Sequence, residues 1–68
     1  MYNYSKLLGL MREKNVTQEN LAESVGMSEV TLNKKLNNNS QFKQSEMVAI
    51  LKALSLPLTD IVTIFFTH

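Results

Sequence analysis

Apolar side chains recur along the chain at the spacing of helix faces, and no segment alternates between apolar and polar residues as a strand does. Spacings of i, i+3, i+4 and i+7 predict one helix over about residues 4–14 and another over about 44–54. A further helix is expected over about 58–66, after a proline that favours a helix start. With two shorter helices within 17–36, the pattern predicts an all-α bundle of five helices.

Residues 17–36 predict two short helices joined by a tight glycine turn. Thr17 and Ser28 stand where a hydroxyl oxygen can accept from an unpaired amide at the start of each helix. Gly26 lies between them, where a sharp turn needs a residue free to adopt a positive φ. The stretch therefore predicts a helix-turn-helix.

The second helix of this pair has a mixed polar face. At about 100° per residue, its two leucines share the inner side, and Val30, Lys34 and Asn37 lie opposite. Amides, a cation and a valine methyl are side chains that can read the edges of DNA bases. The alternative is an ordinary solvated surface with one stray valine.

Length and charge limit these possibilities. Sixty-eight residues predict one domain, 1–68, with a modest core and no cysteine to reinforce it. Seven basic and six acidic residues give a net charge of only +1, which is weak for a nucleic-acid binder. Lys34, Lys35 and Lys43 against Glu29 make residues 28–43 more basic than the average. DNA affinity per protomer is expected to be low and salt-dependent, and dimerisation would raise it.

Other kinds of chemistry find little support in the sequence. It has no recurring spacing of acid, base and nucleophile, no glycine-rich phosphate loop and no cluster of metal ligands, so we expect neither an enzyme nor a cofactor. Its first residues lack the order of a secretory signal, and no apolar run approaches the length of a membrane span. A cytoplasmic protein is expected.

Several residues together resemble a known family. Their pattern is Leu7, Leu10, Thr17-Gln18-Glu19, Leu21-Ala22, Gly26-Met27-Ser28 and Leu32. It is similar to the Cro/C1-type (XRE-like) helix-turn-helix family of phage and bacterial regulators, and it implies the lambda-repressor-like DNA-binding fold. A second stretch resembles small phage regulators within this family: Lys35-Leu36-Asn37, Phe42 and Glu46. Two departures stand out, because Asn38 or Asn39 replaces a frequent glycine and Lys35 occupies a usually apolar position.

The resemblance implies DNA-binding roles for nine residues. Gln18 matches a position that contacts phosphate and braces a side chain of the next helix, although it could simply belong to the capping region. The others match positions in the major groove or in a loop near the phosphates: Ser28, Glu29, Val30, Asn33, Lys34, Asn37, Asn39 and Lys43. Glu29 fits least, because phosphates repel a carboxylate, although it can accept from a cytosine amino group.

The segment 58–66 has more apolar residues than one helix face can bury. One face holds Leu58, Ile61, Val62 and Phe65, which leaves Ile64 and Phe66 on other sides. A second copy of the chain would cover them, and the expected dimer interface consists of Ile61, Ile64, Phe65 and Phe66. The alternative is a last turn that folds back onto its own core.

The sequence therefore predicts a Cro-like phage repressor that reads operator DNA as a homodimer through its second helix-turn-helix element. The alternative is an antirepressor-type interaction protein that keeps this fold but binds another phage repressor. Its contact would be the apolar last helix or the face that carries Val30. The near-neutral charge and Glu29 favour this alternative.

Overall fold

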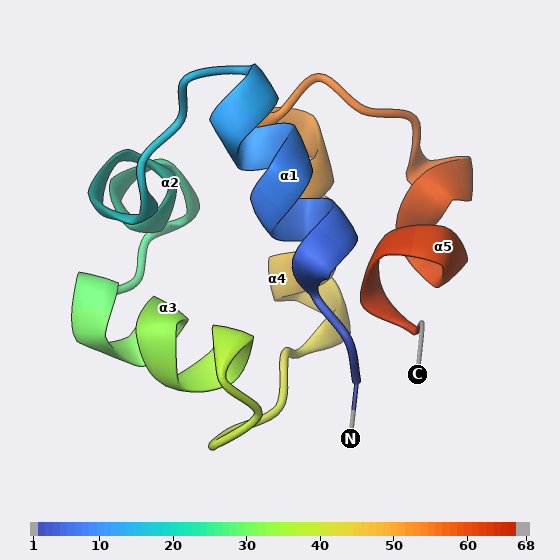
Figure 1. Ribbon diagram of the computed structural model, residues 1–68. Coiled ribbons are helices and arrows are strands. Elements are labelled where there is room, and N and C mark those ends of the chain that lie inside the picture. Colours follow the sequence, from blue (N-terminus) through green and yellow to red (C-terminus); the bar gives the residue numbers. More distant parts are fainter. Residues whose placement is uncertain (1, 67–68) are drawn as a thin grey trace.

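The computed structural model describes residues 2–66, and it confirms the predicted all-α architecture of five helices for that part of the chain (Figure 1). The helices are α1 (Ser5–Glu13), α2 (Gln18–Val25), α3 (Glu29–Leu36), α4 (Gln44–Ala53) and α5 (Ile61–Phe65). The predicted last helix differs from the structure, because its first turn is a separate 3-10 turn, η1 (Leu58–Asp60). Among these helices, none is both long and apolar enough to cross a bilayer.

The helices pack in two groups that share α4. Helix α2 packs against α3 and α4, whereas α5 packs against α1 and α4. In Figure 1 the α2–α3 pair lies on one side of α1 and the red α5 lies on the other. The first described residues lie beside the end of α5, where the rings of Tyr2 and Phe66 meet edge to face at 5.7 Å.

The local signals of the helix-turn-helix are confirmed. The side chain of Thr17 accepts from the amide of Asn20 at 3.1 Å, and that of Ser28 accepts from the amide of Thr31 at 3.1 Å. Gly26 adopts a φ of 77° between the two helices. Each of these signals acts within about one helical turn, so the sequence alone specifies them.

The first four helices end in one shared backbone motif. A residue with positive φ follows each helix, and the next amide donates to a carbonyl five residues earlier. The four positive-φ residues are Asn15, Gly26, Asn38 and Ser55. Only one is glycine, so the other three carry the steric cost of a left-handed conformation. The asparagine loop after α3 thus contains the left-handed residue that its composition favours.

Every helix contributes side chains to a single core. The buried apolar residues are Tyr4, Leu7, Met11, Leu21, Ala22, Leu32, Leu36, Phe42, Met47, Ile50, Leu51, Leu54, Ile64 and Phe65. At one end of this core the rings of Tyr4, Phe42 and Phe65 pack edge to face, with centroids 5.3–6.3 Å apart. Burial, and then the neighbouring phenol of Tyr2, raise the pKa of Tyr4. The aromatic cluster joins the N-terminal segment, the α3–α4 loop and α5.

The predicted orientation of the last helix is wrong. Ile64, assigned to the dimer interface, is fully buried in the chain's own core, and so is Phe65, which was assigned both to the inner face and to that interface. Leu58 and Val62, both assigned to the inner face, are 51% and 65% exposed. The helix is turned because Ile64 is buried beside Phe65, whose ring packs against those of Tyr4 and Phe42.

Candidate functional site

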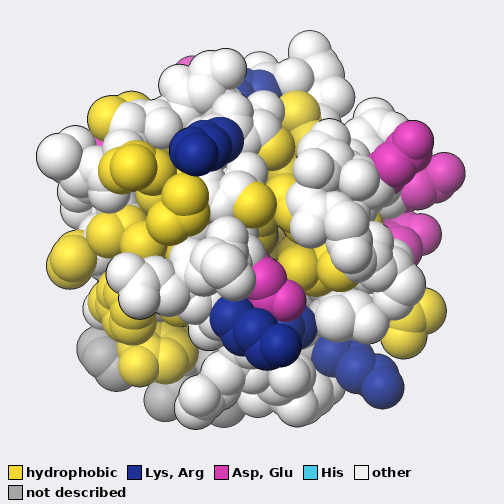
Figure 2. All heavy atoms as spheres, turned by 180° about the vertical axis from the view of Figure 1, so that it is seen from behind, with side chains coloured by type: hydrophobic (Ala, Val, Ile, Leu, Met, Phe, Trp, Pro, Cys, Tyr) yellow, Lys and Arg dark blue, Asp and Glu magenta, His cyan; other side chains and the backbone are white. Residues whose placement is uncertain are grey.

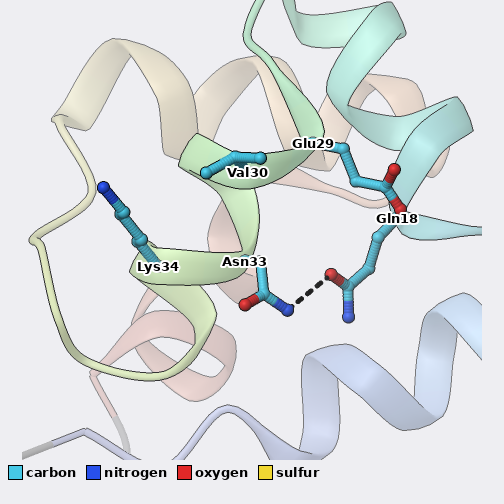
Figure 3. A pocket seen from close by; sticks show the side chains of 5 residues that line it. All are labelled: Gln18, Glu29, Val30, Asn33 and Lys34. Carbon is cyan, nitrogen blue, oxygen red and sulfur yellow. Dashed lines mark hydrogen bonds between the residues drawn. The ribbon is translucent and has the colours of Figure 1, made fainter.

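The α2–α3 pair carries a shallow groove of about 320 Å³. Five of the nine predicted DNA-binding residues line it, namely Gln18, Glu29, Val30, Asn33 and Lys34 (Figure 3). The amide of Asn33 donates to Oε1 of Gln18 at 3.2 Å, so α2 braces α3 across the groove. Val30 is 66% exposed on this face. The sequence therefore identified a real cluster of side chains.

The other four predicted residues lie outside this groove. Ser28 caps α3, and its hydroxyl donates to the hydroxyl of Thr31 at 2.8 Å. The amide of Asn37 turns back to the carbonyl of Asn33 at 2.9 Å. Asn39 is exposed in the following loop, and Lys43 occupies the residue before α4. Intramolecular bonds thus already engage several of the amides that were expected to read bases.

Charge on this face is balanced rather than basic. Lys34 and Glu29 line the same groove, so it carries one cation and one anion. Lys35, which was counted with the basic residues, points inward and is only 6% exposed. A surface of this kind lacks the concentration of cations on which phosphate binding depends.

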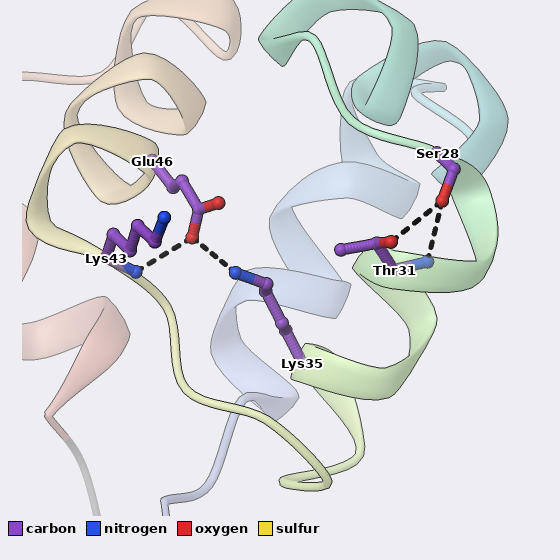
Figure 4. A network of polar contacts seen from close by, with 5 residues as sticks. All are labelled: Ser28, Thr31, Lys35, Lys43 and Glu46. Atoms are coloured by element: carbon purple, nitrogen blue, oxygen red, sulfur yellow. Dashed lines mark hydrogen bonds and ion pairs between the residues drawn. The ribbon is translucent and has the colours of Figure 1, made fainter.

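Lys35 forms a partly buried ion pair that the sequence did not predict. Its ammonium lies 2.7 Å from Oε1 of Glu46, which also accepts from the backbone amide of Lys43 at 2.8 Å (Figure 4). Burial raises the pKa of Glu46, but the bonds from Lys35 and the Lys43 amide, with the charges of both lysines, outweigh it and hold the pKa below 4.5. The pair joins α3 to the start of α4.

A second candidate surface is apolar and lies on the C-terminal helix. Among residues 2–66, four large hydrophobic side chains are exposed, and three of them are Leu58, Val62 and Phe66. They are spaced four residues apart along η1, α5 and the residue that follows α5, so Val62 and Phe66 lie one turn apart. We call these three residues the α5 stripe. Exposed apolar surface that is concentrated in one segment marks an interaction site more often than scattered apolar residues do.

An adjoining groove of about 460 Å³ separates α5 from α4. It is lined by Phe42, Gln44, Met47, Ile61 and Phe66. Phe66 belongs both to this groove and to the α5 stripe, so the two form one continuous apolar surface. Figure 2 views the molecule from behind and shows hydrophobic side chains gathered on that face, with lysine or arginine side chains between them. Of the predicted dimer residues, Ile61 and Phe66 thus remain at the surface.

The sequence missed Phe42, Gln44 and Met47 as members of a surface site. Each lies at or near the start of α4, whose periodicity assigns apolar residues to the core. Phe42 and Met47 are in fact largely buried and form the floor of the groove. The unexplained apolar surplus in 58–66 was the only signal of this site. Within residues 2–66, no group of three potential metal-ligating side chains comes together.

The fold and its surfaces define a small helix-turn-helix domain with a polar α3 face and an apolar α5 surface. The chain belongs to the family described as "Protein of unknown function (DUF739)", which it matches over residues 1–68. No curated protein matches the chain. A solved relative is the modulator of repression of the temperate bacteriophage TP901-1 from Lactococcus lactis. It is 42% identical, with a TM-score of 0.79, over 96% of this chain and 88% of the relative.

This relative overturns the main functional prediction. We expected a Cro-like repressor that reads operator DNA, but the relative is a modulator of repression and is not named as a repressor. The error came from the α3 face, which combines residue types that suit DNA with the balanced charge and internal amide bonds described above. A helix-turn-helix alone does not establish DNA binding, because function resides in the exposed surface and not in the fold.

Proposed function

We propose that this chain is an antirepressor-type regulator that binds a phage repressor protein and thereby changes repression. The observation that carries the proposal is the 42% identity to a phage modulator of repression over nearly the whole chain. The repressor acts on DNA in the host cytoplasm, so the proposed function places this chain there. We further propose that the similarity to Cro/C1-type regulators reflects a shared helix-turn-helix scaffold.

The apolar surface of α5 and its groove fit a protein partner better than the α3 face does. The centre of a protein interface is depleted in charge and rich in aromatic side chains, which match Phe66 and the floor formed by Phe42. The α3 face instead presents a lysine, a glutamate and two amides that are bonded to each other, with Val30 as its one exposed large apolar side chain. We therefore place the repressor contact on the α5 stripe and the adjoining groove.

A matched pair of valines tests which face binds. Val62 on α5 and Val30 on α3 are 65% and 66% exposed, so serine at either position removes a similar amount of surface apolar area. The probe is the purified repressor encoded by the phage genome that carries this chain, and its affinity is measured by calorimetry. The wild-type chain should bind it. Val62→Ser should weaken binding several-fold, whereas Val30→Ser should leave it unchanged.

Three other results would count against the proposal. A wild-type chain that binds no repressor would overturn the function, and weakening by Val30→Ser alone would move the contact to α3. A labelled operator duplex supplies the third measurement, since specific binding of this chain to DNA in the absence of repressor would also contradict the proposal. Sedimentation of the free chain shows whether a second copy covers the α5 stripe instead, as the predicted homodimer requires.

A further inference from the structure

Asn38 holds the N-terminal segment by two complementary hydrogen bonds. Its Oδ1 accepts from the backbone amide of Tyr2 at 3.0 Å, and its Nδ2 donates to the backbone carbonyl of Tyr2 at 2.7 Å. The two residues are 36 positions apart in sequence, and both bonds are partly buried. Asn38 thus binds this peptide segment as the edge of a β-strand would.

The same residue needs an unusual backbone. Asn38 follows the end of α3 with a φ of 63°. Asparagine accepts this conformation better than most residues, and glycine accepts it without strain. Glycine, however, has no side chain to hold Tyr2. An aspartate could accept from the Tyr2 amide but could not donate to its carbonyl. Asparagine meets all three requirements at this position.

Tyr2 in turn supports the proposed contact surface. Its ring meets that of Phe66 edge to face, with centroids 5.7 Å apart and an interplanar angle of 83°. Phe66 follows directly after α5 and lines the groove between α4 and α5. Because α5 is only five residues long, its own backbone bonds hold this last ring weakly. The Tyr2 ring supplies a neighbour that limits the positions of Phe66.

We infer that Asn38 is a positioning residue for partner binding, which fixes Tyr2 and through it the Phe66 wall of the groove. This inference rests on the proposed function, because it assigns a role to Asn38 within the same contact surface. Fixing a side chain before binding lowers the entropy lost on association, so removal of the bonds weakens binding even where the fold survives. Asn38 itself lies in the loop after α3, and its effect on partner binding passes through the rings of Tyr2 and Phe66.

The test compares Asn38→Gly with Asn39→Gly. The first keeps the positive φ and removes both bonds to Tyr2, whereas the second places the same flexibility one residue later, at an exposed side chain. We expect Asn38→Gly to weaken repressor affinity about fivefold and Asn39→Gly to leave it unchanged. Nuclear Overhauser contacts between the Tyr2 and Phe66 rings should fade in the free Asn38→Gly variant and persist in the control.

A double-variant cycle separates positioning from general stability. If Asn38 acts through Tyr2, the pair Asn38→Gly with Tyr2→Ala should bind as Tyr2→Ala alone does. Additive losses, or a lower melting temperature with unchanged affinity for the repressor, would overturn the inference and leave the proposed function intact. A wild-type chain that binds no repressor would overturn both. Persistent ring contacts in the free Asn38→Gly variant would overturn the inference without any partner.

Discussion

The Lys35 ammonium lies 2.7 Å from Oε1 of Glu46, and the same oxygen accepts from the backbone amide of Lys43, the residue before α4. One side chain therefore neutralises a buried cation and also caps a helix. The lysine and glutamate side chains are 8% and 20% exposed. The two residues are 11 apart in sequence, well beyond the three or four residues at which side chains on one helix meet, so only the folded chain brings them together.

The two members of this pair should differ in what their removal costs. Glu46→Ala leaves the Lys35 ammonium buried without its anion and removes the cap of α4, so it should lower the free energy of unfolding by about 2–3 kcal/mol. Lys35→Met replaces the cation with an apolar chain of similar size and keeps the cap, so its cost should stay within about 1 kcal/mol. Urea denaturation of both variants measures the difference. Equal costs would show that the buried charge of Lys35 is not the cause.

The ion pair also predicts a specific response to acid. The pKa of Glu46 in the folded chain lies below its ordinary value of 4.5, so the stabilisation is complete above that value. As the pH falls through 4.5, the unfolded chain takes up the proton first, and the stabilisation is lost as the pH passes the folded pKa. Unfolding of the wild-type chain and of Glu46→Gln at pH 7, 5 and 3 should show a stability difference that narrows in acid. A constant difference would contradict this assignment.

The positive-φ residues after the helices predict changes of opposite sign. Gly26→Ala should cost about 1 kcal/mol from backbone strain alone, since an added Cβ meets no atom within 4 Å. Ser55→Gly should raise stability by up to about 1 kcal/mol, because it removes that strain at a φ of 57°. Thermal unfolding followed by circular dichroism tests both. A loss of stability in Ser55→Gly would mean that chain flexibility outweighs strain at this site.

Local signals explain why most of the fold could be predicted. Thr17, Gly26 and Ser28 each act on backbone groups within four residues, and the structure has all three in the expected roles. The spacing of apolar residues in α1 and α4 likewise indicates one buried face for each helix. These features require no knowledge of distant parts of the chain.

The direction in which α5 faces could not be predicted in this way. Between residues 61 and 66 only Thr63 is polar, so no period distinguishes an inner side from an outer one. The choice depends on distant rings, because Phe65 packs against Tyr4 and Phe42. Once Ile64 and Phe65 are both buried, helical geometry places Val62 and Phe66 on the outer side. The candidate binding surface was therefore hidden in a segment whose sequence pattern is uniform.

The functional error has a similar physical origin. Composition showed that the α3 face contains amides, a lysine and a valine, and the family resemblance implied the brace from Gln18 to α3 that the structure contains, but neither could show that Lys35 points inward. That orientation depends on contacts between elements. A DNA-reading surface and a polar face of this kind share their residue types, and they differ in which polar atoms remain available.

Two adjacent phenylalanines should separate folding from binding. Phe65 is fully buried, so Phe65→Ala should cost about 3–5 kcal/mol and leave a domain of this size largely unfolded at 37 °C. Phe66 is 42% exposed, so Phe66→Ala should cost less than about 1 kcal/mol while it weakens repressor affinity tenfold or more. Thermal unfolding and calorimetric binding to the repressor measure the two effects, and Phe65→Leu serves as a folded control that retains affinity. If Phe66→Ala bound like the wild-type chain, the contact would lie away from the end of α5, and the matched valine variants would then locate it.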